Sequence, residues 1–406
     1  MQDNEKKPAL RFKGFTDPWE QRKLGDAFER VVRKNTNNES RLPLTISAQD
    51  GLVDQITYFN NRVASRDVSN YYLVYNGEFA YNKSTSDGYP FGAVKRLDWY
   101  EKGVLSTLYI VFALKHPEKD DSDFMTVFYD TDRWHRGVAE RAAEGARNHG
   151  LLNISADDFF DIDTTMPEDK VEQEKIGRLL KKLDTLITLH QRKYEKLVNI
   201  KKPMLDKMFP KNGASVPEIR FKGFTDLWEQ RKLGEVFEEY SEKNHAELPP
   251  LTIIQGGGTI RRDESERALQ YDKSSLSNYK MVNKDDFIVH LRSFEGGLEK
   301  ASSQGIISPA YHTFHGEDVD SRFYYAYFRS KKFINKDLKP HVYGIRDGRS
   351  IDIEGMKTIR IPWASYPEQK SIGDFLTHLD TLITLHRRKL EKLQNIKKSC
   401  LEKMFV

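Results

Sequence analysis

Two blocks of sequence occur twice in this chain of 406 residues, both times in the same order. The first block reads RFKGFTDPWEQRKLGDAFE at residues 11–29 and RFKGFTDLWEQRKLGEVFE at residues 220–238. The second reads LDTLITLHQRKYEKLVNIKK at residues 183–202 and LDTLITLHRRKLEKLQNIKK at residues 379–398. Between these blocks the two halves diverge and differ in length by 13 residues. A tandem duplication with similar frames and different contents predicts one scaffold that presents two different surfaces.

The composition excludes several classes of protein. A hydrophobic content of 38% predicts globular cores, and a net charge of only +4 leaves no tail of a single charge sign. Cys400 is the only cysteine, which excludes an intrachain disulfide and a cluster of thiolate metal ligands. The N-terminal residues lack the apolar core of a signal peptide, and the most apolar segment, 105–114, is shorter than the roughly 20 residues that span a bilayer. We therefore predict a cytoplasmic protein without a membrane segment.

Apolar residues recur every three or four positions towards the end of each half. A period near 3.5 over several heptads predicts two long helices that pair as a coiled coil. His190 and His386 lie in these stripes and are interpreted as packed residues rather than acid-base catalysts. Pro203 predicts that the first helix kinks or stops near Lys202. The predicted coiled-coil and partner residues are Ile176, Leu180, Leu183, Ile187, Tyr194 and Leu197 in the first helix, and Ile372, Leu376, Leu379, Ile383, Leu390 and Leu393 in the second.

The diverged stretches are predicted to be two mixed α/β modules that share a fold. Short β-prone runs, at 71–75, 105–114, 287–291 and 323–328, alternate with turns rich in Gly, Asn, Asp and Ser. The segment GVLSTLYIVF at 103–112 parallels GIISPAYHTF at 305–314. We predict a division into a first module at 1–165, a central helix at 166–210, a second module at 211–363 and a C-terminal helix at 364–406.

The motifs of common catalytic sites are missing from the sequence. It contains no P-loop, no G-x-G-x-x-G dinucleotide site and no H-E-x-x-H zinc helix. An N-P-P-[YF] methyltransferase motif and a nuclease carboxylate cluster are also missing. His312 and His315 have a spacing that suits a metal, but without cysteines or a nearby acidic residue they are interpreted as ordinary strand or loop residues. The chain is therefore interpreted as non-catalytic.

Cationic, amide and aromatic residues gather among glycines in both modules. Arg and Lys neutralise phosphates, and Arg, Asn and Gln also form paired hydrogen bonds with base edges. We therefore predict that these loops bind nucleic acid, with an ordinary solvated loop residue as the alternative for each. The candidates are Asn82, Lys83, Tyr89, Lys95, Arg96, Arg147 and Asn148 in the first module, and Gln255, Arg261, Arg262, Lys273, Arg292, Arg346 and Arg349 in the second.

The repeated blocks, together with Lys-Met-Phe at 207–209 and 403–405, resemble the specificity subunits of type I restriction-modification systems. The resemblance covers the whole chain. It implies an α/β (α+β) fold with two pseudo-symmetric target-recognition domains separated by two long helices that form an antiparallel coiled coil. It also implies that each domain recognises one half of an asymmetric, bipartite site in double-stranded DNA.

The resemblance further implies partners that carry out the chemistry. Two modification (methyltransferase) subunits would carry S-adenosylmethionine and methylate adenine, and restriction (translocase/nuclease) subunits would use ATP and magnesium to translocate and cut DNA. No cofactor is expected in this chain. The main alternative is a coiled-coil structural adaptor whose paired modules bind proteins, and a salt-dependent affinity for DNA would separate the two interpretations. A self-contained nuclease or methyltransferase is disfavoured by the missing motifs.

Overall fold

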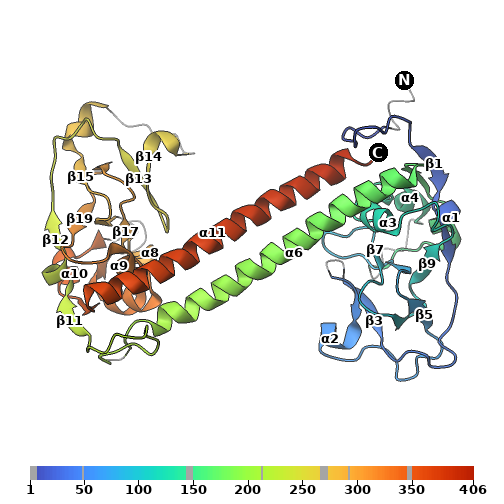
Figure 1. The fold of residues 1–406 in the computed structure, drawn as a ribbon, viewed down its shortest axis with the longest axis horizontal. Helices are drawn as coiled ribbons and strands as arrows, with labels where there is room; N and C mark the ends of the chain where they lie inside the picture. The colour runs from blue at the N-terminus through green and yellow to red at the C-terminus, as the bar shows by residue number, and fades with distance from the viewer. Residues whose placement is uncertain are drawn as a thin grey trace. The chain divides into compact units, whose positions relative to one another are not determined.

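The computed structural model describes residues 7–47, 50–142, 150–211, 214–265, 273–290, 293–344 and 350–406. The chain forms two compact units, one made of residues 1–190 with 389–406 and the other of residues 191–388. Each unit contains one α/β module and parts of two long helices, α6 (Lys170–Lys207) and α11 (Tyr366–Lys403) (Figure 1). The four-segment division of the sequence stays a prediction.

The first module is built from one larger antiparallel sheet and three strand pairs. The larger sheet has the order β2-β9-β6-β7 and consists of β2 (Phe28–Arg30), β9 (Ile110–Leu114), β6 (Phe79–Asn82) and β7 (Ala93–Arg96). The pairs are β1 (Glu20–Lys23) with β10 (Asp163–Met166), β3 (Leu44–Ser47) with β4 (Gly51–Asp54), and β5 (Tyr72–Tyr75) with β8 (Lys102–Leu105). The short helices are α1 (Leu24–Ala27), α2 (Gln55–Phe59), α3 (Ser122–Phe128), α4 (His135–Arg141) and α5 (Ala156–Phe160).

The second module repeats this plan strand by strand. Its larger sheet has the order β12-β19-β16-β17 and consists of β12 (Glu238–Tyr240), β19 (His312–His315), β16 (Phe287–Val289) and β17 (Glu299–Lys300). The matching pairs are β11 (Glu229–Lys232) with β22 (Arg360–Trp363), β13 (Leu251–Ile254) with β14 (Gly258–Arg261), and β15 (Lys280–Val282) with β18 (Gly305–Ile307). A further pair joins β20 (Val342–Tyr343) to β21 (Ser350–Ile351).

The second module also contains short α-helices and several other helical turns. The α-helices are α7 (Leu233–Val236), α8 (Ser293–Gly296), α9 (Ser321–Phe328) and α10 (Ile353–Lys357). The other turns are η2 (Arg262–Glu264), η3 (Lys273–Asn278), η4 (Phe333–Leu338) and η5 (Lys339–His341).

Matching aromatic side chains form the centre of each module. In the first, Phe28 lies 4.9 Å from Phe112 and 5.5 Å from Phe79 between ring centroids. In the second, Phe237 takes the place of Phe28 and lies 5.3 Å from Phe287. All five rings are at most 1% exposed. Such aromatic pairs contribute about 0.5–1.5 kcal/mol each beyond the burial of their apolar area. Because the matching residues pack in the same way, the duplicated sequence produces a duplicated core.

Three of the four β-prone runs contain strands, and the fourth is a helix. Residues 323–328 belong to α9, so the prediction of a strand there is wrong. The buried aromatic residues Phe323, Tyr324, Tyr327 and Phe328 are spaced by one and three, which places them on one side of a helix rather than one side of a strand. The Asp320 carboxylate also caps this helix by accepting from the N–H groups of Arg322 and Phe323.

The parallel between segments 103–112 and 305–314 is confirmed. Each segment forms a strand, turns, and enters the larger sheet as a second strand. The turns are closed by the same hydrogen bond, from Tyr109 N to Ser106 O at 3.2 Å and from Tyr311 N to Ser308 O at 3.1 Å. The predicted continuous run at 105–114 is therefore two strands of different sheets.

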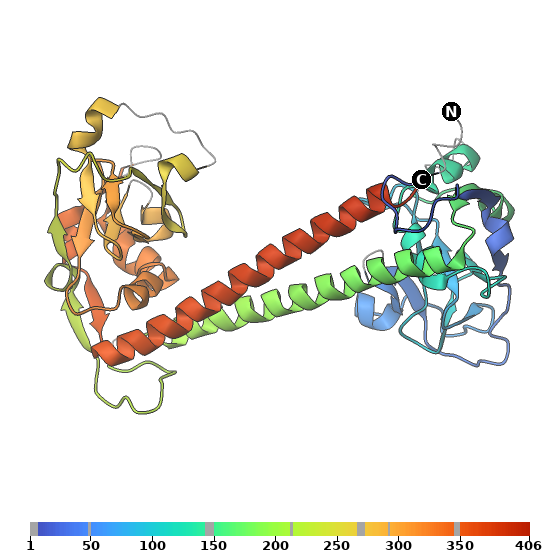
Figure 2. The same cartoon turned by 45° about the horizontal axis from the view of Figure 1, so that its top comes forward.

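The long helices α6 and α11 each contain 38 residues and lie side by side in opposite directions (Figures 1 and 2). Asp184 of α6 pairs with Lys397 near the end of α11, with 2.6 Å between Oδ1 and Nζ. Lys201, further along α6, pairs with Asp380, which comes earlier in α11. Residue numbers therefore rise along one helix as they fall along the other. The prediction of mixed α/β modules with an antiparallel helix pair is confirmed.

Pro203 does not stop the first helix, because α6 continues through it to Lys207. A proline in a helix removes one hydrogen bond and costs about 3 kcal/mol. The residues after it offset this cost by packing: Met208 and Phe209 are buried in the core of the second module, and Met204 and Leu205 pack against it. Tertiary burial therefore outweighs the local preference that the sequence predicts.

Candidate nucleic-acid interface

Each module is joined to the start of a long helix by the same buried ion pair. In the first module, Arg11 donates two hydrogen bonds to the Glu172 carboxylate, at 2.6 and 2.8 Å. In the second, Arg220 donates two to Glu368, at 2.6 and 2.7 Å. These carboxylate hydrogen bonds raise the pKa of both arginines. Because Glu172 and Glu368 are at most 1% exposed, loss of either arginine would leave an uncompensated buried charge.

The next residue of each helix forms a second repeated contact. The Gln173 side chain accepts from the N–H of Asp121 and donates to the carbonyl of Pro167, both at 2.8 Å. Gln369 accepts from the N–H of Asp320 at 3.0 Å and donates to the carbonyl of Ala364 at 2.8 Å. Both glutamines are buried. Each therefore links its long helix to the start of α3 or α9 in the same way.

The Lys-Met-Phe repeats end the two helices in matching pockets of aromatic side chains. Phe405 lies 6.1 Å from Trp19 and 5.5 Å from Phe124 between ring centroids, in the first unit. Phe209 lies 6.4 Å from Trp228 and 5.0 Å from Phe323, in the second. The end of each helix therefore packs into the module of its own unit. These contacts explain why both frames are kept alike in sequence.

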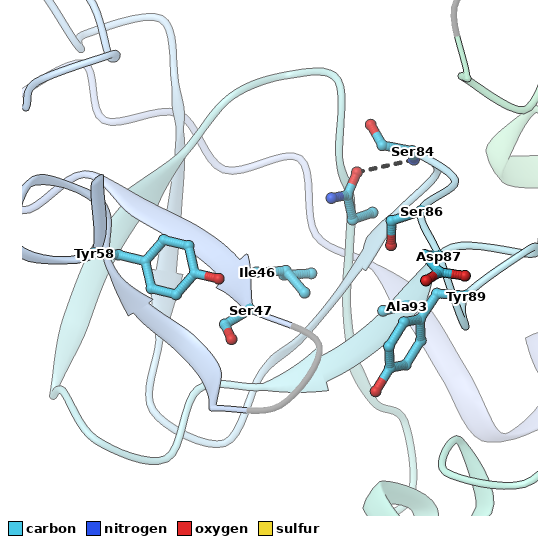
Figure 3. Close-up of a pocket in the computed structure, with 9 residues that line it drawn as sticks. Ile46, Ser47, Tyr58, Ser84, Ser86, Asp87, Tyr89 and Ala93 are labelled. Carbon is cyan, nitrogen blue, oxygen red and sulfur yellow. Dashed lines mark hydrogen bonds between the residues drawn. The ribbon is translucent and has the colours of Figure 1, made fainter. Parts of the chain in front are cut away.

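The loops beyond these frames contain the predicted nucleic-acid residues, and in the first module Asn82 and Tyr89 both line a pocket of about 290 Å³ (Figure 3). The side-chain oxygen Oδ1 of Asn82 accepts from the backbone N–H of Ser84 at 3.0 Å. Lys83 is half-buried, and its ammonium group donates to the carbonyl of Ile154 at 3.3 Å. Asn82 and Tyr89 are thus brought together, whereas Lys83 takes part in the packing of the loop.

The two other cations of this module that were predicted to bind DNA and that the structure describes, Lys95 and Arg96, are paired with carboxylates. Lys95 donates to Asp130 at 2.9 Å. Arg96 donates to Asp98 at 2.6 Å, to Asp123 at 2.7 Å and to the Ser122 hydroxyl at 2.7 Å. Burial lowers the pKa of Arg96, but the hydrogen bonds and charges of the two carboxylates outweigh it and raise the pKa overall. Their assignment to DNA stays a prediction, and their positive charges are already compensated within the fold.

In the second module three of the predicted residues lie in the β13–β14 hairpin or directly after it. Gln255 is exposed in the turn between β13 and β14. Arg261 is exposed and donates to both oxygens of Asp263, at 3.1 and 2.8 Å, and these contacts raise its pKa. Arg262 is half-buried, with its guanidinium carbon 5.2 Å from the centroid of the Tyr279 ring. Gln255 and Arg261 are thus the more accessible members of this group.

Several predicted residues lie outside the described part of the chain. They are Arg147 and Asn148 in the first module, and Arg292, Arg346 and Arg349 in the second. Lys273 is the first residue of η3, and its side chain is likewise outside the description. Their assignment to DNA stays a prediction.

The histidines of β19 do not approach a common point. His312 contacts Glu239 at 2.7 Å and His315 contacts Asp286 at 2.6 Å. Two strand residues separated by three positions face opposite sides of the sheet. The expectation that they have no acidic neighbour is wrong, but each has a different one. Among the described residues, no group of three or more His, Cys, Asp or Glu side chains could bind a metal ion.

The predicted apolar stripes of the long helices divide into buried and half-buried positions. His190 and His386 are half-buried. The buried members are Ile176, Leu180 and Leu183 in α6, and Ile372, Leu376, Leu379 and Leu390 in α11. The half-buried members are Ile187, Tyr194, Leu197, Ile383 and Leu393. In the described part of the chain, no helix is both long and apolar enough to cross a membrane.

The sequence reasoning missed the residues that position the modules. Glu172 and Glu368, each followed by Gln and four residues later by Ile-Gly, recur at the starts of the two long helices. That repeated signal could have identified them. Ser86 and Asp87 of the pocket were also missed, because a serine and a carboxylate are not the cationic and amide side chains that indicate a DNA contact in sequence.

Comparison with known proteins agrees with this architecture of two matching modules and two matching helices. Residues 225–395 match the family described as "Type I restriction modification DNA specificity domain". This part of the chain is similar to that family, and the resemblance inferred from the repeated blocks is confirmed.

Relatives extend the likeness to most of the chain. The MjaVIII type I restriction enzyme specificity subunit of Methanocaldococcus jannaschii is 25% identical over 317 residues, which is 73% of this chain and 72% of the relative. The putative MjaX type I restriction enzyme specificity subunit of the same organism is 23% identical over 406 residues, 94% of this chain and 91% of the relative. The crystal structure of the type I restriction-modification S subunit from M. genitalium has a similar fold, with a TM-score of 0.57, 14% identity, and coverage of 98% of this chain and 99% of that chain.

Proposed function

We propose that this chain is the DNA sequence-specificity subunit of a type I restriction-modification complex. Each module recognises one half of an asymmetric, bipartite site in double-stranded DNA. Partner subunits methylate adenine at that site or cleave the DNA, and this chain itself carries out no catalytic step. The family description and the two M. jannaschii relatives, both specificity subunits, support this proposal.

The single observation that carries the proposal is the repeated attachment of two modules whose loops differ. Arg11 with Glu172 and Arg220 with Glu368 join each module to its helix by the same bonds. A homodimeric DNA-binding protein has two identical surfaces and recognises a palindrome. Two different modules on one repeated scaffold remove that restriction. One chain can then recognise two different half-sites.

The helices provide two similar docking surfaces for two modification subunits. Leu189 of α6 and Leu385 of α11 occupy matching positions in the repeated helix block, and each is 44% exposed. Exposed apolar residues at repeated positions suit two copies of one protein partner. In the proposal these partners bring S-adenosylmethionine, and restriction subunits bring ATP and magnesium.

The first test is a genome-wide map of methylated adenines in cells that carry the modification subunit, with and without this chain. The expected result is methylation at a split, asymmetric motif only when the chain is present. Exchanging residues 20–165 for the corresponding region of a relative should then change one half of the motif. The proposal fails if the assembled complex produces no motif that depends on this chain, or if both halves change together.

The coiled-coil adaptor remains the second candidate, because the exposed leucines are also suited to protein partners in the absence of DNA. The two proposals differ in their salt dependence. Binding of duplex DNA that weakens steeply between about 50 and 200 mM salt supports DNA recognition, since each neutralised phosphate releases counterions. An adaptor would show protein binding without this DNA affinity.

A further inference from the structure

The pocket of the first module lies between the β3–β4 hairpin, with the adjoining α2, and the loop that joins β6 to β7 (Figure 3). Tyr58 and Tyr89 stand on opposite sides of it, and Ser84, Ser86 and Asp87 line the side of the loop (Figure 3). Among the described residues that line it, none is a lysine or arginine. Among these described residues a phosphate would meet a carboxylate and no cation, and this lining does not favour the DNA backbone.

The position of Asp87 is fixed by the loop before any ligand binds. Two backbone hydrogen bonds close the turn around it, from Tyr89 N to Ser86 O at 2.9 Å and from Ser86 N to Tyr89 O at 3.3 Å. Gly88 has a φ of +77°, which a residue with a side chain adopts only with strain. Thr85 N also donates to the carbonyl of Gly150 at 2.6 Å, which ties the loop to a distant segment.

The polar groups of the pocket have capacity to bind a ligand. Within the part of the chain that the structure describes, neither the Asp87 carboxylate nor the Tyr58 and Tyr89 hydroxyls take part in a hydrogen bond or ion pair. The Asn82 oxygen is occupied by the Ser84 N–H, so its amide nitrogen is directed to other acceptors. Tyr58, which lines the pocket, is 50% exposed and offers a flat apolar face. Acceptors, donors and aromatic faces together suit the edge of a base pair.

We propose that this pocket recognises the major-groove edge of a C·G base pair in the half-site of the first module, with the Asp87 carboxylate accepting a hydrogen bond from cytosine N4. This inference rests on the proposed function. Cytosine presents only a donor in the major groove, whereas adenine also presents the N7 acceptor, which repels a carboxylate. The Asn82 amide and the serine hydroxyls then serve as donors to the O6 and N7 acceptors of the paired guanine.

The β13–β14 hairpin of the second module corresponds to the β3–β4 hairpin on one side of this pocket and is built differently, as two different half-sites require. There the β13–β14 turn is tied down by the buried Glu299, which accepts from the N–H groups of Gly256 at 2.7 Å and Gly258 at 3.2 Å. The guanidinium of Arg329 lies against Gly256, only 2.8 Å from where a Cβ would stand. The turn of the β13–β14 hairpin is thus tied to a buried carboxylate, whereas none of the described contacts of the β3–β4 hairpin includes a buried carboxylate.

The test compares the methylated motif of the assembled complex containing wild-type chain, Asp87→Asn or Asp87→Ala. The matched control is Asp132→Asn, which makes the same chemical change at an exposed carboxylate outside the pocket. Competition binding with duplexes varied at each position gives the discrimination between bases. Both Asp87 variants are expected to lose the cytosine preference at one position of one half-site by roughly 5- to 150-fold. The other half-site and the Asp132→Asn motif should stay unchanged.

An unchanged motif in both Asp87 variants, with the complex assembled, would overturn the assignment of the pocket. A change in both half-sites would also overturn it, since it would indicate a general loss of fold. Absence of any chain-dependent motif with the wild-type complex would instead reject the proposed function. Circular dichroism of each variant establishes that the exposed substitution leaves the fold intact.

Discussion

Lys95 of β7 and Asp130, which follows α3, form an ion pair of 2.9 Å whose two charges are exchanged in the second module. The corresponding residues there are Glu299 and Arg329, with 2.5 Å between Oε1 and Nη1. Strand register establishes the match, because Lys95 lies opposite Ala80 and Glu299 lies opposite Ile288, at equivalent places in the two sheets. The fold thus keeps the pair and reverses its polarity.

This reversal connects the pair to different parts of each unit. In the first unit, Asp130 also contacts Lys397 of α11 at 3.4 Å, and Lys397 contacts Asp184 of α6. The sheet is therefore linked to the long helices by alternating charges. In the second unit, Arg329 is the counterpart of Asp130, and its positive charge would repel a lysine of the long helices. There the carboxylate partner instead stabilises the turn of the β13–β14 hairpin.

Replacing Lys95 by Glu is expected to destabilise the chain by about 1–3 kcal/mol, because it places two carboxylates together in a half-buried site. The double variant K95E/D130R recreates the polarity of the second module and should recover part of this loss. Recovery should be incomplete, because Lys397 then faces the introduced guanidinium instead of the Asp130 carboxylate. Urea unfolding of the single and double variants gives the coupling free energy. A double variant no more stable than K95E would contradict the pairing.

The same site predicts how stability depends on pH. Burial alone raises the pKa of Asp130, but the positive charges of Lys95 and Lys397 outweigh burial and lower it overall. A carboxyl group with a lowered folded pKa stabilises the fold above its unfolded pKa, near 3.9, and this contribution is lost as pH falls through the folded value. The free-energy difference between wild type and Asp130→Asn should therefore be constant from about pH 5 to 8 and shrink below about pH 4. A difference that grows in acid would reverse the assigned sign.

The repeated parts of the fold could be predicted from the sequence, because duplication exposes them directly. The apolar periodicity predicts the two long helices, and the sequence similarity between segments 103–112 and 305–314 predicts their common structure. Local preference failed at Pro203 and at the aromatic run 323–328, where tertiary packing decides the structure. In the second case a cap by Asp320 was available in the sequence as a sign of a helix.

The candidate site was harder to predict than the scaffold. Arg96 and Lys95 looked like free cations in the sequence, but their carboxylate partners come from distant segments that only the fold brings near. Asp87 is the opposite case. A single acidic residue between Ser86 and Gly88 does not indicate a binding site in the sequence, and its place in a pocket becomes evident only when the turn and the facing Tyr58 are seen together. Which charges are compensated is thus a property of tertiary structure.

Gly177→Ala should destabilise the first unit, although alanine usually improves a helix by about 1 kcal/mol. A Cβ at Gly177 would stand 2.6 Å from the backbone nitrogen of Phe124 and 2.9 Å from the Asp121 carboxylate. Because backbone atoms of α3 must then move, we expect an overpacking cost of about 1–3 kcal/mol that exceeds the gain. Thermal unfolding measures the net effect.

Asn395→Ala on the exposed face of α11 is the control for this substitution, since it improves helix propensity without a steric cost. It should be neutral or slightly stabilising. The matching Gly373 predicts the same behaviour in the second unit, where a Cβ would stand 2.7 Å from the Asp320 carboxylate. If Gly177→Ala raises the melting temperature as Asn395→Ala does, the close approach of α6 to α3 is not present in solution.

A circularly permuted form of residues 1–406 should fold, because Leu10 and Lys403 meet in the same kind of junction as Ile219 and Lys207. Leu10 N donates to Lys403 O at 2.8 Å, and Ile219 N donates to Lys207 O at 3.0 Å at the corresponding place. Eleven residues, 208–218, join the second pair of residues, and direct fusion of residue 406 to residue 1 would join the first pair through twelve.

New ends can then be opened between Lys211 and Ala214. The free energy of unfolding of the permuted chain should lie within about 1 kcal/mol of the wild-type value, because among the described residues the cut opens a surface turn closed by the hydrogen bond from Ala214 N to Lys211 O. A control opened between Phe112 and Ala113, inside β9, should fail to fold because it cuts the central sheet. Equal stability of both permutants would show that the repeated junction does not explain the tolerance.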